Sequence, residues 1–526
     1  MKTSFRSLVV LALVIGVAAS AGEVRFKPVT PDASPEAVAL LDFLQEISGR
    51  YTLTGQHNPP VGRDRNSLFA GAYTGKMPAV WTSDFGFAGP GDSDSTENRP
   101  AIVQEAIRQH RLGSIISLCW HAVPPTADEP VTFQPVPGAD PAKLHSVQGK
   151  LTDEQFRDIL TPGTALYNHW AAQVDVIAGF LKQLQDAHVP VIWRPYHEMN
   201  GDWFWWGGRI DGPYTTQALY RQLFDRFVYH HHLKNLIWLW STDRVHNPAM
   251  EHAKYFPGMQ YVDVLGLDVY GGDFAQSYYD SLVQLSQGKP LALAEVGTPP
   301  HPEVMAKQPL WTYYAIWTSM VRNTTPAGYA DIMSGGRMLG RSDPVYAEIT
   351  ASYRRACGLP VLTPVAPPSL AELAPAIPAG PAGAGFSGSW VLDEAASKFG
   401  PMGAAFSPAR LVVNRVGTAL DVKSYFVREY KDDDTMEVRY ALDGSETKSQ
   451  FMRSERVTVA KSGDDPNTIT METVTTLARG TPPRKLNSHE TWTLTDGGTH
   501  LVIHNVSDSF MNAGQTTDQT FVFDRH

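Results

Sequence analysis

Eight short apolar runs alternate with amphipathic helical stretches in the first two thirds of this 526-residue chain. Such alternation is typical of βα units, whose strands pair in parallel. Eight units over roughly 310 residues predict an α/β fold, a (β/α)₈ TIM barrel, which usually takes about 250 residues before insertions. The expected strands are 51–56, 79–85, 114–120, 191–196, 236–240, 262–267, 291–295 and 315–319.

Polar side chains stand at or just after the carboxyl end of most of these runs. They are Gln56, His57, Asp84, His121, His197, Glu198, Asp243, Asp268, Tyr270 and Glu295. The active site of a TIM barrel is built at the face where its strands end. We therefore expect these side chains to gather around one site.

Two of these residues stand out: Glu198 follows the fourth expected strand and Glu295 ends the seventh. Glycosidic cleavage with retention needs a carboxylic acid and a carboxylate about 5–5.5 Å apart. At that distance one carboxylate raises the pKa of the other by about two units at an effective dielectric constant of 20. Arg194 and a phenol such as Tyr270 favour an ionised Glu295, which leaves Glu198 as the protonated partner.

Five segments carry a resemblance to a known family. They are Gly55-Gln56-His57-Asn58, Trp120-His121, the long run 193–207, Leu267-Asp268-Val269-Tyr270 and Ala294-Glu295-Val296-Gly297. Together they make residues 40–357 similar to glycoside hydrolase family 26, most of whose members are endo-β-1,4-mannanases. The resemblance implies a retaining hydrolase with Glu198 as acid/base and Glu295 as nucleophile.

The same resemblance implies roles for the neighbouring side chains. His197 would orient the sugar and the nucleophile, and His121 and Arg194 would line the cleavage subsite. Trp203 would lie near the acid/base, and Tyr270 would donate a hydrogen bond to the nucleophile, with Asp268 close by. Trp317, expected on the last strand, would form the aromatic platform under the sugar. Phe204, Trp205 and Trp206 are as consistent with packing as with ligand contact.

Three alternatives stay open at this point. The same retaining chemistry acts on mixed-linkage β-glucan or β-1,3-xylan in a minority of the resembled family. A catalytically inactive polysaccharide-binding protein would keep the barrel and lose hydrolysis. Glu198 and Glu295 would in a third case be structural ion-pair partners. The proposed chemistry needs no cofactor and no metal, and His230-His231-His232 is better explained as a solvated helix end.

Composition limits the partners of the chain. It has 44 basic and 54 acidic residues, a net charge of −10, with no basic stripe for nucleic acid. Its 13 Trp, 20 Tyr and 22 Phe include clusters beside His, Asp and Glu, which suit sugar rings. We expect a β-mannan-type polysaccharide as substrate and no membrane insertion; the sequence does not predict an oligomeric state.

Residues 1–21 have the features of a secretory signal peptide. Lys2 and Arg6 precede an apolar run, and Ala19-Ser20-Ala21 has the small-x-small form of a cleavage site. The sequence therefore predicts a secreted protein, extracellular or periplasmic. Cys119 and Cys357 are the chain's 2 cysteines, so no disulfide framework is expected.

A Pro- and Ala-rich segment divides the rest of the chain. Residues 359–385 hold seven Pro and seven Ala with almost no charge, which is typical of a linker. The expected catalytic domain is 22–358, and 386–526 alternates like an all-β antiparallel barrel or sandwich of unknown function. Its opening Gly388-Ser389-Trp390 resembles the entry signature of lipocalins.

Overall fold

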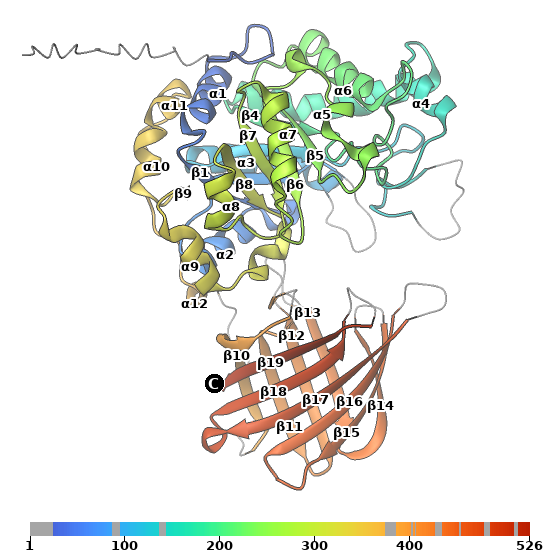
Figure 1. The fold of residues 1–526 in the computed structure, drawn as a ribbon, viewed down its shortest axis with the longest axis vertical. Helices are drawn as coiled ribbons and strands as arrows, with labels where there is room; N and C mark the ends of the chain where they lie inside the picture. The colour runs from blue at the N-terminus through green and yellow to red at the C-terminus, as the bar shows by residue number, and fades with distance from the viewer. Residues whose placement is uncertain are drawn as a thin grey trace, which may run out of the picture.

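The eight predicted strand regions pair in parallel and close into a barrel, which confirms the TIM barrel (Figure 1). The computed structural model describes residues 25–86, 95–135, 144–373, 385–400, 403–404, 407–426, 434–451, 454–477, 484–509 and 514–526. The barrel strands are β1 Thr52–His57, β2 Val80–Asp84, β3 Ile115–Trp120, β4 Val191–Pro195, β5 Leu236–Asp243, β6 Val264–Val269, β7 Leu291–Val296 and β8 Trp311–Ile316. A two-residue strand, β9 (Met338–Leu339), adds to β1.

Every residue of these eight strands is buried, because side chains fill the barrel on one face and helices cover the other. The helices are α1 Pro35–Ile47, α2 Arg65–Thr74, α3 Ser95–Arg111, α4 Asp153–Ile159, α5 Ala165–Asp186, α6 Thr216–Asp225, α7 Gln276–Ser286, α8 Pro302–Lys307, α9 Pro326–Ser334, α10 Pro344–Ile349 and α11 Ala351–Ala356. In α5, Val174, Ile177 and Leu181 recur at helical spacing and bury one face.

The last barrel strand begins four residues earlier and ends three residues earlier than predicted. The sequence analysis expected 315–319, whereas β8 ends at Ile316 and a 3₁₀ helix follows at Thr318–Asn323. Thr318 has φ +38°, so the chain turns sharply there and no longer continues as a strand. Trp317 is therefore not on the last strand but directly after its carboxyl end.

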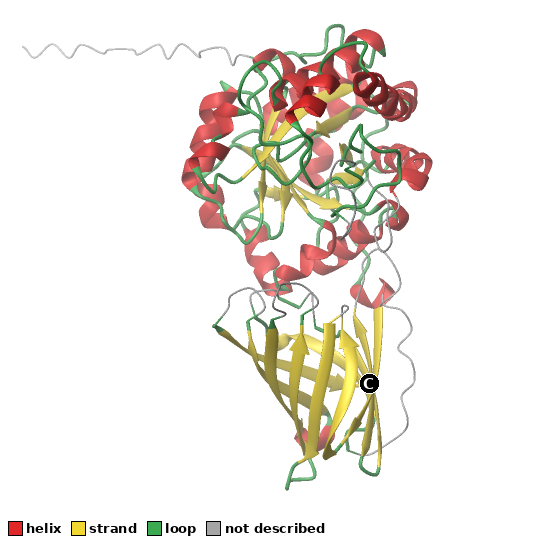
Figure 2. Ribbon diagram, turned by 90° about the vertical axis from the view of Figure 1, so that its right-hand side faces the viewer, coloured by secondary structure: helices red, strands yellow, loops and turns green. Residues whose placement is uncertain are grey.

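Residues from Gly388 onward form a second, antiparallel sheet of ten strands that curls into a barrel (Figure 2). The strands are β10 Gly388–Lys398, β11 Arg410–Val416, β12 Ala419–Phe426, β13 Asp434–Ala441, β14 Asp443–Phe451, β15 Ser454–Ser462, β16 Thr468–Thr476, β17 Lys485–Thr495, β18 His500–Asp508 and β19 Thr516–Arg525. Each pairs with its sequence neighbour except β13 and β14, and β10 pairs with β19. The sequence analysis expected either an antiparallel barrel or a sandwich, and the structure has the barrel.

Turns at Gly- and Asp-containing positions connect the strands of this module. Asp443-Gly444 lies at the corner where β13 gives way to β14, and Asp496-Gly497-Gly498 forms the 3₁₀ turn between β17 and β18. A closed apolar cluster fills one end of the barrel, with Trp390, Leu420 and Leu501 fully buried. The module therefore has a core of its own.

The segments at the two ends of the catalytic domain are only partly within the described residues. The predicted signal peptide, residues 1–21, lies outside them. In the predicted linker, residues 359–373 are described and end in a one-turn helix, α12 (Leu370–Leu373). Among the helices that the structure describes, none combines the length and the apolar character that crossing a bilayer requires.

Candidate active site

The carboxyl ends of β4, β6 and β7 bring three acidic side chains together. One carboxylate oxygen from each of Glu198, Asp268 and Glu295 lies within 4.8 Å of the other two. Two of these residues were predicted as the reacting pair from positions almost a hundred residues apart in the chain. A close pair matches the separation of about 5–5.5 Å in retaining glycosidases, whereas inverting enzymes need about 6.5–9.5 Å.

Glu295 is held by two donors. The Arg194 guanidinium, from β4, forms a buried ion pair with one oxygen of Glu295, and the Tyr270 hydroxyl donates to the other oxygen at 2.6 Å. Arg194 also pairs with Asp268 at 2.9 Å. Both donors stabilise a negative charge on Glu295 and fix the orientation of its carboxylate.

Glu198 has the opposite environment. Burial raises its pKa to about 8, with further contributions from the negative charges of Glu295 and Asp243. The Trp203 indole N–H donates to its carboxyl group at 2.8 Å. At neutral pH Glu198 is therefore mainly protonated, as a general acid must be.

The backbone around Glu198 is strained. Tyr196 and Glu198 have φ of +48° and +51°, in the left-handed region that non-glycine residues rarely adopt. The Glu198 N–H donates to the Ser241 carbonyl of β5 at 3.1 Å, which fixes the turn. Strain of this kind persists at functional sites where the surrounding structure holds it.

A chain of hydrogen-bonding groups lies beside the acidic residues. The Asp84 carboxylate contacts Nδ1 of His121, and Nε2 of His121 lies 3.1 Å from Nε2 of His197. Asp84 also accepts the backbone N–H groups of His121 at 3.1 Å and Gly86 at 2.7 Å. Burial lowers the pKa of His197 well below its ordinary value, so its imidazole is neutral.

Trp317 lies at the same face and stacks on His57, with ring centroids 4.0 Å apart. His121 is 6.1 Å from Trp317 between ring centroids, so the aromatic platform adjoins the histidine pair. Burial lowers the pKa of His57 to about 3. A neutral imidazole under the indole keeps this part of the site uncharged.

The aromatic run after Glu198 divides into two groups. Trp203 is partly exposed and contacts Glu198, as the resemblance implied. Phe204, Trp205 and Trp206 are buried, and the Trp206 indole donates to the His197 carbonyl at 2.8 Å. These three side chains pack beneath the site and brace its backbone.

The structure thus gathers all nine predicted site residues at one face: His121, Arg194, His197, Glu198, Trp203, Asp268, Tyr270, Glu295 and Trp317. Their catalytic roles stay predictions. Asp84 and Asp243 act on these residues but were recognised from the sequence only as polar residues at strand ends. The signal for Asp84 was its position on the strand next to that of His121, since neighbouring parallel strands end side by side.

Comparisons with known proteins identify the family of this chain. The sequence profile of glycosyl hydrolase family 26 matches residues 29–334. A mannan endo-1,4-β-mannosidase of Thermothelomyces thermophilus is 33% identical over 295 residues, covering 55% of this chain and 56% of that protein. This chain spans about half the length of the curated relatives it matches.

Solved structures of family 26 proteins also match this chain. A family 26 protein from a Muricauda species is 38% identical, with a TM-score of 0.54 over 59% of this chain and 98% of that one. A β-mannanase from a protist symbiont of the termite Reticulitermes speratus, solved with a gluco-manno-oligosaccharide, is 27% identical with a TM-score of 0.50, over 60% and 96%. The lipocalin resemblance of Gly388-Ser389-Trp390 is not confirmed.

Proposed function

Because this chain belongs to glycosyl hydrolase family 26, we propose that it is an endo-β-1,4-mannanase that hydrolyses internal mannosidic bonds of mannan, glucomannan or galactomannan with retention. The observation that carries the proposal is the close approach of the Glu198 and Glu295 carboxylates in opposite environments. The mannan endo-1,4-β-mannosidase relatives and the gluco-manno-oligosaccharide complex support the substrate class.

The reaction proceeds by double displacement. A Glu295 oxygen bonds to the anomeric carbon while the bond from that carbon to the leaving oxygen breaks, and Glu198 gives its proton to the leaving oxygen. Arg194 and Tyr270 hold the attacking carboxylate in place. In the second step Glu198, now ionised, takes a proton from water, whose oxygen bonds to the anomeric carbon and releases Glu295.

The decisive experiment tests both carboxylates on mannan. Glu198→Ala and Glu295→Ala each remove a group that the transition state needs, so turnover falls by orders of magnitude while circular dichroism stays unchanged. Near wild-type rates in either variant contradict the assignment.

Azide separates the two roles on an aryl β-mannoside with a good leaving group. Glu198→Ala with azide yields the β-glycosyl azide, because azide enters from the face that the leaving group vacated. Glu295→Ala yields the α-azide, because azide then replaces the nucleophile. The reverse pattern contradicts the assignment. Parallel assays on locust bean gum, barley β-glucan and β-1,3-xylan identify the polymer.

We also propose that the protein is secreted, on the signal-peptide features of residues 1–21. N-terminal sequencing of the protein recovered outside the cytoplasm of the producing cell is expected to begin near Gly22. A product that stays in the cytoplasm and keeps Lys2 and Arg6 contradicts this proposal.

A further inference from the structure

The C-terminal barrel encloses a cavity of about 450 Å³. A closed barrel of about eight strands is just filled by its own side chains or holds one small ligand, and the diameter grows with strand number. This barrel has ten strands. Interior space is therefore expected, and the volume found falls within the range of about 300–1,000 Å³ typical of small-molecule sites.

The wall formed by β17, β18 and β19 changes from apolar to polar in steps. Residues that face each other across these strands form rows inside the barrel, since alternate side chains point inward. The inner row is Trp492, Ile503 and Phe521, the next is Glu490, Asn505 and Gln519, and the third is Ser488, Ser507 and Thr517. The cavity thus has an apolar floor and a polar band above it on this wall.

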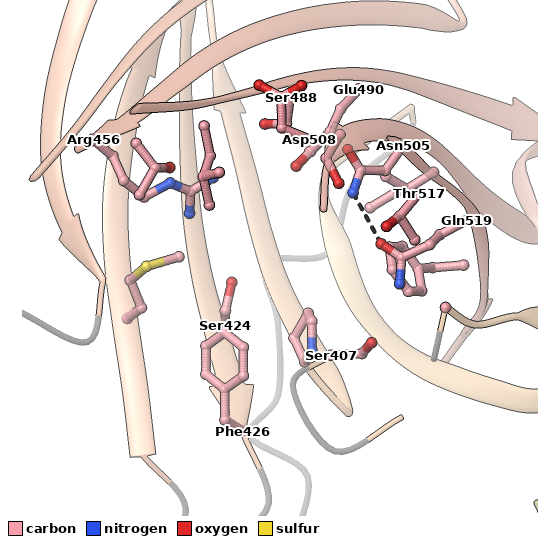
Figure 3. A pocket seen from close by; sticks show the side chains of 18 of the residues that line it. Ser407, Ser424, Phe426, Arg456, Ser488, Glu490, Asn505, Asp508, Thr517 and Gln519 are labelled. Atoms are coloured by element: carbon pink, nitrogen blue, oxygen red, sulfur yellow. Dashed lines mark hydrogen bonds between the residues drawn. The ribbon is translucent and has the colours of Figure 1, made fainter. Parts of the chain in front are cut away.

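The facing wall is different (Figure 3). There Phe426, Met436 and Tyr440 line the cavity mainly with carbon, and Ser424 of β12 is the cross-strand neighbour of Met436 on β13. Arg456, labelled in Figure 3, belongs to β15. Among the described residues that line the cavity, Arg456 is the one Lys or Arg side chain.

The acidic lining residues already have donors in the wall. Glu490 accepts the Trp492 indole N–H at 2.9 Å, and Asp508 accepts the backbone and side-chain N–H groups of Asn487 at 2.8 and 2.9 Å. The Asn505 side chain donates to Gln519 at 3.3 Å, while its buried oxygen has no hydrogen-bond partner among the described residues.

Polar side chains inside a barrel cost stability unless they are satisfied. Packing alone favours apolar residues at these positions, as the other end of the same strands demonstrates with Leu494 and Leu501. Departures from such patterning are expected at functional sites. The polar band and Arg456 therefore indicate a binding role rather than a packing role.

We propose that this cavity binds a small amphipathic anion, with a hydrocarbon body on the apolar floor and an acidic head group between Arg456 and the amides of Asn505 and Gln519. A guanidinium and amide N–H groups are the donors that a carboxylate prefers. A sugar fits less well, because hydroxyl groups around its whole ring would meet Phe426, Met436 and Phe523 without hydrogen-bond partners.

Calorimetric titration of the full chain with dodecanoate, below its micelle concentration, tests the proposal. The expected result is saturable binding with one site per chain. Ser424→Phe fills the cavity and is expected to weaken binding at least tenfold, and Arg456→Met removes the cation and is expected to weaken it at least fivefold. Mannan hydrolysis by both variants is expected to match wild type, and the melting transition and circular dichroism of the C-terminal barrel are expected to be unchanged, which reports that the mutated module is folded.

Two outward-facing substitutions on β13 are matched controls. Arg439→Met makes the same change as Arg456→Met at an exposed position, and Thr435→Phe introduces the same phenyl ring as Ser424→Phe at an exposed position. Both should alter affinity less than twofold. The proposal is overturned if dodecanoate shows no saturable binding or if both cavity variants bind like wild type. Displacement of dodecanoate by mannotriose also overturns it, since the cavity would then be a saccharide site.

Discussion

One guanidinium, that of Arg194, gives the two proposed catalytic glutamates different environments. Arg194 pairs with Glu295 and Asp268 but not with Glu198. Glu295 also receives the Tyr270 hydroxyl, whereas Glu198 receives only a neutral indole N–H. Two chemically identical side chains thus have different hydrogen-bond donors and charged neighbours, as their two proposed roles require.

The raised pKa of Glu198 predicts the alkaline limit of activity. Because the first step needs the protonated acid, kcat/KM is expected to stay level up to a pH of about 8 and then fall about tenfold per pH unit. Asp243→Asn removes a negative charge that helps raise this pKa, so the limit should move to lower pH. A pH profile of kcat/KM on a soluble mannan measures both.

Asp202→Asn serves as the control for this shift. Asp202 is exposed, pairs with Lys150 and does not act on the pKa of Glu198. Its alkaline limit should coincide with that of wild type. If the alkaline limit of the Asp243→Asn variant is unchanged or moves to higher pH, the negative charge of Asp243 does not help to raise the pKa of Glu198.

Asp84 is expected to position His121 rather than to react. Asp84→Asn keeps an acceptor for the backbone N–H groups of His121 and Gly86 but loses the charge that orients the imidazole. We expect kcat on mannan to fall at least tenfold with little change in melting temperature. Unchanged kcat, or loss of kcat only together with loss of the folded state, contradicts a positioning role.

At the element scale, the sequence predicted the strand ends better than the connections between them. The apolar runs before Glu198 and Glu295 predicted the positions of both residues correctly, because a buried strand is recognised from the hydrophobicity of its own residues. The eighth strand was displaced because aromatic and apolar residues continue from Tyr313 to Trp317, past the end of the strand at Ile316, and the turn at Thr318 is a backbone feature that this pattern does not mark. Asp243 raises the pKa of Glu198 and Asp84 contacts His121, in each case from a different strand. Contacts between strands leave no local pattern in the sequence.

The loop after β4 depends on Gly201. A Cβ atom on Gly201 would lie 2.2 Å from ring atoms of Trp203, so Gly201→Ala must displace the indole that donates to Glu198. We expect hydrolysis of mannan to slow at least tenfold while the chain stays folded. Gly179→Ala, in the middle of α5 where nothing lies within 4 Å, is the control and should keep full activity. Equal activity of both variants contradicts the argument.

At the scale of the whole molecule, the two barrels meet through a small polar contact. Arg322, in the 3₁₀ helix after β8, donates to Glu394 of β10 at 2.7 and 3.0 Å, and the Tyr73 hydroxyl of α2 donates to the same carboxylate at 2.5 Å. The Arg322 side chain is 2% exposed and that of Glu394 is 19% exposed. The stretch directly after Trp317 is therefore anchored to the C-terminal module.

This contact predicts that the module stabilises the catalytic barrel. Glu394→Gln leaves the buried Arg322 guanidinium without its carboxylate, and removing one partner of a buried ion pair typically costs about 3–5 kcal/mol. Because Glu394 is partly exposed, we expect a smaller cost, visible in calorimetry as a barrel transition several degrees below that of wild type. Glu437→Gln breaks the exposed pair with Lys423 and should leave the melting temperature nearly unchanged, since exposed pairs contribute about 0–1 kcal/mol. If both variants melt like wild type, the Arg322–Glu394 pair contributes nothing to the stability of the catalytic barrel.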